Sequence, residues 1–215
     1  MSTARRPGRA DGRAQRERLR IAQAAARLIA DHGLTDWTLA KRKAVRQLLI
    51  PDTAALPSND EIEAALADHH AIFGGEAHAA TLRRQRTEAL VWMRRLAQWD
   101  PLLVGGVAAG WATEHSDVRL ELVADDPKSV EIALASGGIA YAALPARDDD
   151  ATAHLRIDSG RVAIGLSIVA PQQRRNRPRH DEEPRLNIAA VAELLAEETA
   201  NPTPAANSPR REQSR

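Results

Sequence analysis

The chain of 215 residues contains no cysteine, so it forms neither disulfide bonds nor thiolate metal sites. That absence fits a reducing compartment, and we expect a cytoplasmic location. Aromatic residues make up only 3% of the sequence, so the core has to be built from Leu, Ile, Val and Ala. No uninterrupted apolar run approaches the ~20 residues that a membrane-spanning helix needs. Gln23 and Arg27 break the apolar stretch 21–30 near the N-terminus, so we expect neither a membrane partner nor a secretory signal.

The formal net charge is only +1, but the basic residues are unevenly distributed. Seven arginines lie within the first 20 residues: Arg5, Arg6, Arg9, Arg13, Arg16, Arg18 and Arg20. Because Pro7, Gly8 and Gly12 stand among them, residues 1–15 are predicted to be a disordered basic N-terminus. Pro, Asn, Ser and Arg are frequent in residues 199–215, which we expect to form a disordered tail.

Hydrophobic periodicity predicts a helical region over residues 16–99. Apolar residues recur there at three- and four-residue spacing in four stretches, at about 16–32, 37–49, 60–73 and 80–98. Gly33 is a natural C-cap for the first helix, and Ser58 or Asn59 can cap the third.

Residues 100–198 change to a pattern of short strands and helices. Strands are expected at 102–104, 118–124, 139–143, 154–157 and 161–169, and helices at 107–113, 128–135 and 186–198. Asp158-Ser159-Gly160 is a strong hairpin signal between the last two strands, whereas residues 171–185 are predicted to be a polar loop. The predicted fold class is therefore α+β, with an N-terminal helical region followed by a small mixed sheet and its flanking helices.

One stretch of this second region, residues 102–127, carries the interpretation of function. A short strand leads to the pair Gly105-Gly106, a short helix, and then Ser116-Asp117 at the start of the next strand. This order resembles the core of the nucleotidyltransferase superfamily, where a Gly-Ser turn and a spacer precede Asp-x-Asp on the next strand. The resemblance implies a nucleotidyltransferase-like domain over residues 100–198. An active member would use magnesium and a nucleoside triphosphate.

The sequence departs from that family pattern at the positions that hold the metal. Arg119 stands where the second Asp is expected, and we expect its guanidinium to pair with Asp117. Asp117 and Glu121 remain candidate metal ligands, although they would lie about 13 Å apart along the strand. We therefore predict no catalytic residues and no cofactor, in a degenerate domain that binds a nucleotide, another anion or a protein partner. The candidate phosphate-binding residues are Gly105, Gly106, Ser116 and Arg119. The alternative is an active nucleotidyltransferase with an atypical metal site.

A weaker likeness covers residues 18–40. The segment IAQAAARLIADHGLTDWTLA resembles the first helix and turn of TetR-type regulators, although a proline-bearing linker, IPDTAALPSND, follows where those regulators have a recognition helix. The second hypothesis is accordingly a nucleic-acid-binding regulator, with candidate contacts Arg16, Arg18, Lys41, Arg42, Lys43 and Arg46. These charges would otherwise form the solvated face of a packed helix. A third hypothesis is that the basic helix 83–95 docks on an acidic protein surface.

Overall fold

The computed structural model describes residues 9–32, 34, 36–51, 55–145, 151–176 and 184–200. Its mixture of helices and one mixed sheet confirms the predicted α+β fold class. The chain divides between Gly74 and Gly75 into two compact units, which we call the helical unit and the sheet unit. Within the described ranges, every helix is too short or too polar to span a lipid bilayer.

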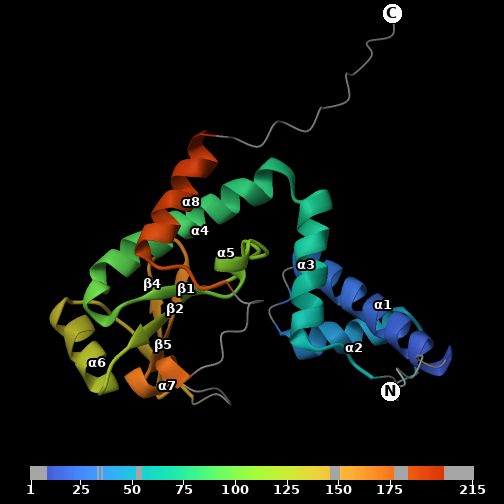
Figure 1. The fold of residues 1–215 in the computed structure, drawn as a ribbon, viewed down its shortest axis with the longest axis horizontal. Helices are drawn as coiled ribbons and strands as arrows, with labels where there is room; N and C mark the ends of the chain where they lie inside the picture. Colours follow the sequence, from blue (N-terminus) through green and yellow to red (C-terminus); the bar gives the residue numbers. More distant parts are fainter. Residues whose placement is uncertain are drawn as a thin grey trace, which may run out of the picture. The chain divides into compact units, whose positions relative to one another are not determined.

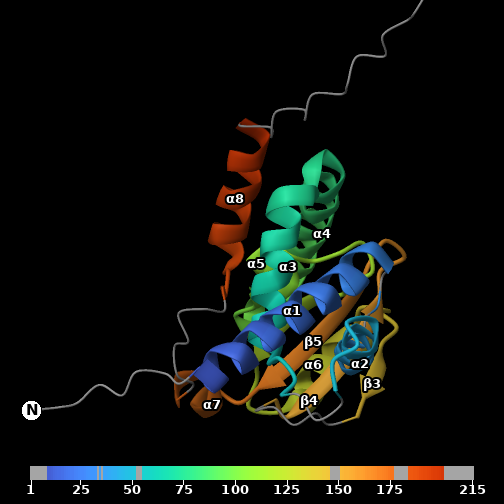
Figure 2. The same ribbon diagram turned by 90° about the vertical axis from the view of Figure 1, so that its right-hand side faces the viewer.

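The helical unit consists of α1 (Arg9–His32), α2 (Trp37–Gln47) and α3 (Asn59–Phe73). Helix α1 packs against both α2 and α3 (Figure 2). Its inner side carries the buried residues Ile21, Ala22, Ala25, Ala26, Leu28 and Ile29. Three of these are alanines, whose small side chains let neighbouring helices approach closely while little surface stays exposed.

Local signals set where these helices begin. The Asp36 carboxylate accepts a hydrogen bond from the Leu39 N–H at 3.0 Å, and Ser58 and Glu61 form a reciprocal capping box at the start of α3. The predicted cap at Ser58 is therefore confirmed. Helix α1 starts at Arg9, so the disordered segment expected over 1–15 is wrong for residues 9–15. Residues 1–8 and 201–215 lie outside the described part of the chain.

The sheet unit is built around five strands: β1 (Leu102–Val104), β2 (Val118–Val123), β3 (Ala142–Leu144), β4 (Ala153–Asp158) and β5 (Ala163–Val169). Their order across the sheet is β1-β2-β5-β4-β3. Strands β2 and β5 run parallel, and every other neighbouring pair is antiparallel. The β4–β5 hairpin was predicted, whereas the β2–β5 pairing joins residues 46 positions apart in the chain and has no local signal.

Helices accompany these strands: α4 (Gly75–Arg95), the 3₁₀ turn η1 (Ala97–Trp99), α5 (Gly106–Ala109), α6 (Pro127–Ser136), α7 (Pro171–Asn176) and α8 (Ile188–Ala200). The loop predicted over 171–185 is therefore wrong at its start, which is helical. Helix α4 was expected to belong with the preceding helices, but Leu90, Trp92 and Met93 join the apolar core of the sheet unit. Burial of these side chains explains why the division falls at Gly74–Gly75 and not near residue 99.

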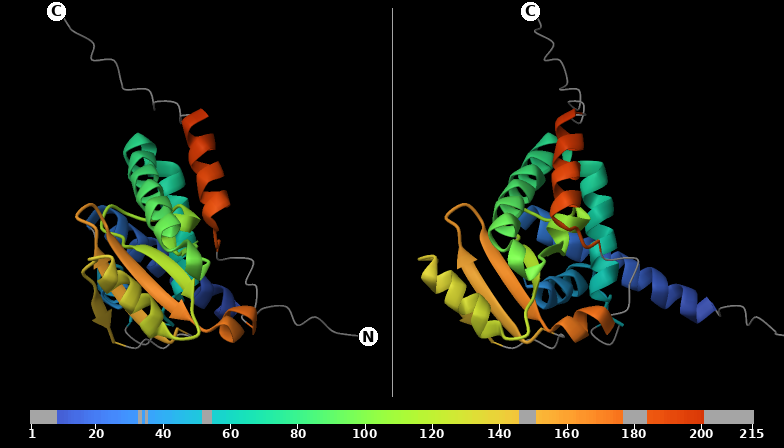
Figure 3. Two further views of the ribbon diagram at one scale, coloured as in Figure 1. Left: turned by 90° about the vertical axis from the view of Figure 1, so that its left-hand side faces the viewer. Right: turned by 60° about the vertical axis from the view of Figure 1, so that its left-hand side comes forward.

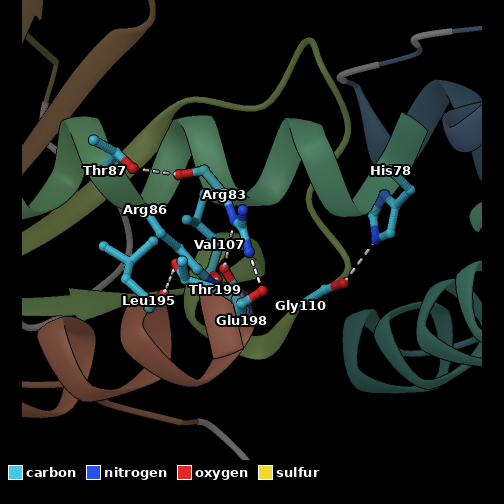
Figure 4. Close-up of polar contacts among 9 residues, drawn as sticks. All are labelled: His78, Arg83, Arg86, Thr87, Val107, Gly110, Leu195, Glu198 and Thr199. Carbon is cyan, nitrogen blue, oxygen red and sulfur yellow. Dashed lines mark hydrogen bonds and ion pairs between the residues drawn. The ribbon is translucent and has the colours of Figure 1, made fainter. Parts of the chain in front are cut away.

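Helix α8 lies alongside α4 (Figures 1 and 3). A cluster of polar contacts joins the two helices (Figure 4). Arg86 of α4 donates from Nε to the Val107 carbonyl at 3.1 Å, and its Nη1 pairs with the Glu198 carboxylate of α8. The Arg83 guanidinium bonds the Glu198 backbone carbonyl, so the end of α8 is fixed to α4 by two arginines.

The two faces of the sheet differ in chemistry because side chains alternate along each strand. One face carries the apolar core, including Leu120, Leu122, Leu155, Ile164 and Leu166, which forms one cluster with side chains of α4, α5, α6 and α8. On β2, β5 and β4 the opposite face carries Arg119, Glu121, Gly165, Ser167, His154 and Arg156. We call this second side the polar face, and the candidate site lies on it.

Candidate anion site on the polar face

The strand register places two arginines on either side of a glycine. Gly165 of β5 is the Cα partner of Arg119 on β2 and of Arg156 on β4. Two strand spacings separate the arginine Cα atoms, about 10 Å. The two arginine side chains therefore project from the same face of the sheet. Because Gly165 has no side chain, only backbone separates their Cβ atoms. A Cβ built on Gly165 would come no closer than 3.9 Å to another heavy atom, so there is room above it.

Arg119 lies against the glycine turn that precedes α5. A Cβ built on Gly105 would lie 2.3 Å from Nη2 of Arg119, and Gly105 has a φ of +69°. Both the space and the backbone conformation therefore require glycine at this position. The Arg119 side chain is exposed, and within the described part of the chain no carboxylate or carbonyl accepts a hydrogen bond from it. Of the candidate phosphate-binding residues, Gly105 and Arg119 are thus brought together.

Asp117 pairs with Arg156 and not with Arg119. The Arg156 Nε lies 3.4 Å from Oδ2 of Asp117, and both side chains are about half exposed. The pairing expected between Asp117 and Arg119 is wrong, because Arg156 comes across from β4 and Arg119 turns toward Gly105. Asp117 thus faces one of the two guanidinium groups, that of Arg156.

Glu121, the second candidate metal ligand, is buried beneath arginines. It is 3% exposed, and its two carboxylate oxygens lie 3.1 and 3.3 Å from Nη1 of Arg185, with Arg174 Nε at 3.9 Å. These guanidinium groups supply the positive charge that the buried carboxylate requires. Glu121 therefore has a structural role here, and bound cations would have to compete with two arginines. Among the described residues no group of three or more His, Asp or Glu side chains is arranged to hold a metal ion.

Gly106 and Ser116 lie close to the turn but serve its packing. A Cβ on Gly106 would lie 2.7 Å from Cζ3 of Trp111, so the glycine makes room for the indole ring. The Ser116 hydroxyl accepts a hydrogen bond from the Thr113 N–H at 3.0 Å, inside a tight turn. Gly106 thus makes room for Trp111 and the Ser116 hydroxyl bonds Thr113, so both residues serve the packing of the segment between β1 and β2.

Several polar-face residues were missed by sequence reasoning. Arg156, Gly165, Ser167 and His154 all come from the β4–β5 hairpin, and Ser167 Oγ lies 3.2 Å from Nδ1 of the buried His154. The hairpin itself was predicted, so its register could have placed Arg156 beside Gly165. Their position next to Arg119 depends on the long-range pairing of β2 with β5.

The basic residues proposed for nucleic-acid contact divide into two sets. Arg16, Arg42, Lys43 and Arg46 are exposed. Arg18 is half-buried, and Lys41 donates a hydrogen bond to Oδ1 of Asn59 at 2.9 Å, which links α2 to the start of α3. Burial lowers the pKa of Lys41, against the opposing effect of Glu61 and Asp60. Arg18 and Lys41 thus contribute to packing within the helical unit.

Two comparisons with known proteins bear on the family of this chain. A scan against protein-family models found no match, and a search of curated proteins found none either. The likenesses to nucleotidyltransferases and to TetR-type regulators stay predictions. The geometry and charge of the residues themselves are what indicate a function for this chain.

Proposed function

We propose that the sheet unit is a non-catalytic, nucleotidyltransferase-like domain that binds a nucleotide or another small phosphate-bearing anion. The main support is Arg119, which replaces a family carboxylate, is exposed, and lies against Gly105 without a hydrogen-bonding partner among the described residues. A guanidinium presents several donors in a plane and matches phosphate oxygens in pairs. An unpaired arginine over a glycine turn is suited to such a ligand.

The charges around the two carboxylates support binding without metal chemistry. Asp117 already faces Arg156, and Glu121 faces Arg185 and Arg174. A divalent cation near either carboxylate would be repelled by the neighbouring guanidinium groups. Anions are attracted by the same arrangement, which is why we favour an anion-binding domain over an active transferase.

Isothermal titration of the full chain with ATP, with and without magnesium, tests this proposal. We expect binding in both conditions, no turnover, and an affinity about tenfold lower in Arg119→Gln, because a charge-assisted hydrogen bond is lost. Arg84→Gln is the matched control, since Arg84 is exposed on α4 and the variant loses the same charge. Binding that requires magnesium and is followed by release of pyrophosphate would favour the alternative of an active nucleotidyltransferase.

A second candidate function belongs to the helical unit, where charge is segregated between helices. Residues 9–47 contain ten Arg and Lys against four Asp and Glu, whereas α3 contains four acids and no Arg or Lys. Exposed arginines follow one side of α1: Arg13, Arg16, Arg20 and Arg27. We propose that this side contacts the phosphate backbone of double-stranded nucleic acid. No aromatic residue lies on α1 to stack on the bases of a single strand.

The salt dependence of DNA binding tests this second candidate. Each phosphate contact adds about −0.9 to the slope of log K against log salt concentration, so four arginines predict a slope near −4. The triple variant Arg16→Gln, Arg20→Gln, Arg27→Gln should make this slope less negative by about 3. Its control removes three exposed arginines of the sheet unit, Arg84, Arg94 and Arg175. Equal losses in the two triple variants would contradict a surface on α1.

A further inference from the structure

The position of Asp117 carries an inference that rests on the proposed anion-binding function. Asp117 immediately precedes β2, two residues before Arg119, and its partner is Arg156, which comes from β4 across Gly165. The Arg156 guanidinium thus already faces a negatively charged carboxylate, while Arg119 starts from the other side of Gly165 and has no hydrogen-bonding partner among the described residues. We infer that this carboxylate occupies the anion position in the free protein, and that a phosphate monoester displaces it from Arg156.

The geometry favours displacement because the ion pair is weak. Arg156 and Asp117 are separated by 3.4 Å, through Nε alone, and their side chains are 47 and 43% exposed. Exposed ion pairs of this kind contribute little stability, so separating this pair reduces the favourable free energy of ligand binding only slightly. A phosphate monoester can accept from two arginines at once, which a single carboxylate oxygen at this distance does not do.

Gly165 provides the space that the ligand needs. Its Cα lies between the bases of Arg119 and Arg156, and the nearest atoms to a Cβ at this position are 3.9 Å away. An alanine at position 165 therefore fits the fold without moving other atoms. Its methyl group would, however, occupy part of the space between the two arginines that the ligand needs. The ligand class is a phosphate monoester bound by Arg119 and Arg156 over Gly165, without a divalent metal.

Substitution of Asp117 should change the affinity for a nucleotide in opposite directions, depending on whether Asp117 binds a metal ion or competes with the ligand. If Asp117 held magnesium, Asp117→Asn would weaken nucleotide binding. If Asp117 competes with the ligand for Arg156, the same variant frees Arg156, removes a repelling charge, and tightens binding. We expect an affinity about threefold to tenfold higher, from the loss of an exposed ion pair and of one like charge.

The experiment is isothermal titration of the full chain with AMP and, separately, with inorganic phosphate, in EDTA and then in magnesium. Asp117→Asn should bind AMP more tightly, while Arg156→Gln and Gly165→Ala should bind it more weakly, by about tenfold and at least threefold respectively. None of these affinities should depend on magnesium. Asp126→Asn is the matched control: it removes one carboxylate at the opposite end of β2, and asparagine still caps α6.

The outcomes separate this inference from the proposed function. Weaker binding by Asp117→Asn, or binding that needs magnesium, would overturn the inference and favour a metal ligand. Binding by the wild type that none of these variants changes would place the anion elsewhere and also overturn it, although the chain would still bind an anion. Absence of binding to ATP, AMP and phosphate would contradict the proposed function itself. Circular dichroism of Gly165→Ala distinguishes a lost site from a lost fold.

Discussion

Arg86 of α4 and Glu198 of α8 form an ion pair inside the sheet unit, with the arginine side chain 9% and the glutamate side chain 24% exposed. The same guanidinium reaches the Val107 carbonyl of α5, so one side chain connects three helices (Figure 4). The last described turn of α8 is therefore attached to the core by charge as well as by apolar contact. The strands that carry Arg119, Arg156 and Gly165 belong to the same unit.

Glu198→Ala should destabilise the sheet unit by about 1–3 kcal/mol, less than a fully buried pair would cost because Glu198 is partly exposed. The loss arises because Arg86 is left in a buried position without its carboxylate. Urea unfolding followed by circular dichroism measures it. Glu197→Ala is the control. The Glu197 side chain is exposed, so this substitution should change the stability of the unit by less than about 0.5 kcal/mol.

Gly106→Ala should destabilise the turn before α5 by about 1–3 kcal/mol, because the new methyl group would lie 2.7 Å from the Trp111 ring and force it to move. Tryptophan fluorescence and urea unfolding together report the displaced ring and the lost stability. Gly165→Ala is the comparison, since its methyl group meets only ordinary contacts. Similar losses of stability in the two variants would mean that contact with Trp111 is not the reason why residue 106 has to be glycine.

Leu49→Gly should stabilise the helical unit by about 0.5–1 kcal/mol. Leu49 has a φ of +53°, a conformation that costs a side-chain-bearing residue about 1–2 kcal/mol. It is 91% exposed, so the side chain adds little packing in return. The gain is partly offset by the greater freedom of glycine in the unfolded chain. Thermal unfolding measures the change, and Leu56→Gly, at a residue without positive φ, should lower the melting temperature instead.

Glu121→Gln distinguishes a structural carboxylate from a metal ligand. We expect it to lower stability by about 1–3 kcal/mol, because Arg185 loses a buried charged partner, and to leave AMP binding within about twofold of wild type. Urea unfolding and titration calorimetry are the two measurements. Glu114→Gln, at an exposed position, controls for the charge. Intact stability combined with lost nucleotide binding would restore Glu121 as a functional ligand.

Much of the secondary structure was accessible from short-range patterns. The capping box at Ser58, the hairpin at Asp158-Ser159-Gly160, and the helix that begins after Asp126 are each encoded within a few residues. The glycine turn and Arg119 were also singled out from the sequence as parts of a possible phosphate site. Such features are predictable because capping, turn conformation and alternation depend on neighbours along the chain.

Other features had no such local signal. Helix α7 has a polar sequence, PQQRRN, with no apolar stripe that would predict a helix. Helix α4 has the same periodicity as the helices before it, and only the burial of its side chains in the core of the sheet unit shows which unit it belongs to. The partner expected for Asp117, Arg119, was wrong for a similar reason. Arg156 lies 39 residues further along the chain, and only the order of the strands brings it within 3.4 Å of Asp117.

The amino-acid sequence alone determined the α+β class, the positions of most helices and strands, and the presence of Arg119 two residues after Asp117. The tertiary structure decided which groups surround that arginine. Parallel pairing of β2 with β5 places Gly165 beside Arg119, and the hairpin then adds Arg156 on the far side. Registers between distant strands are fixed by burial of the whole apolar face, a property of the folded sheet that no short segment contains.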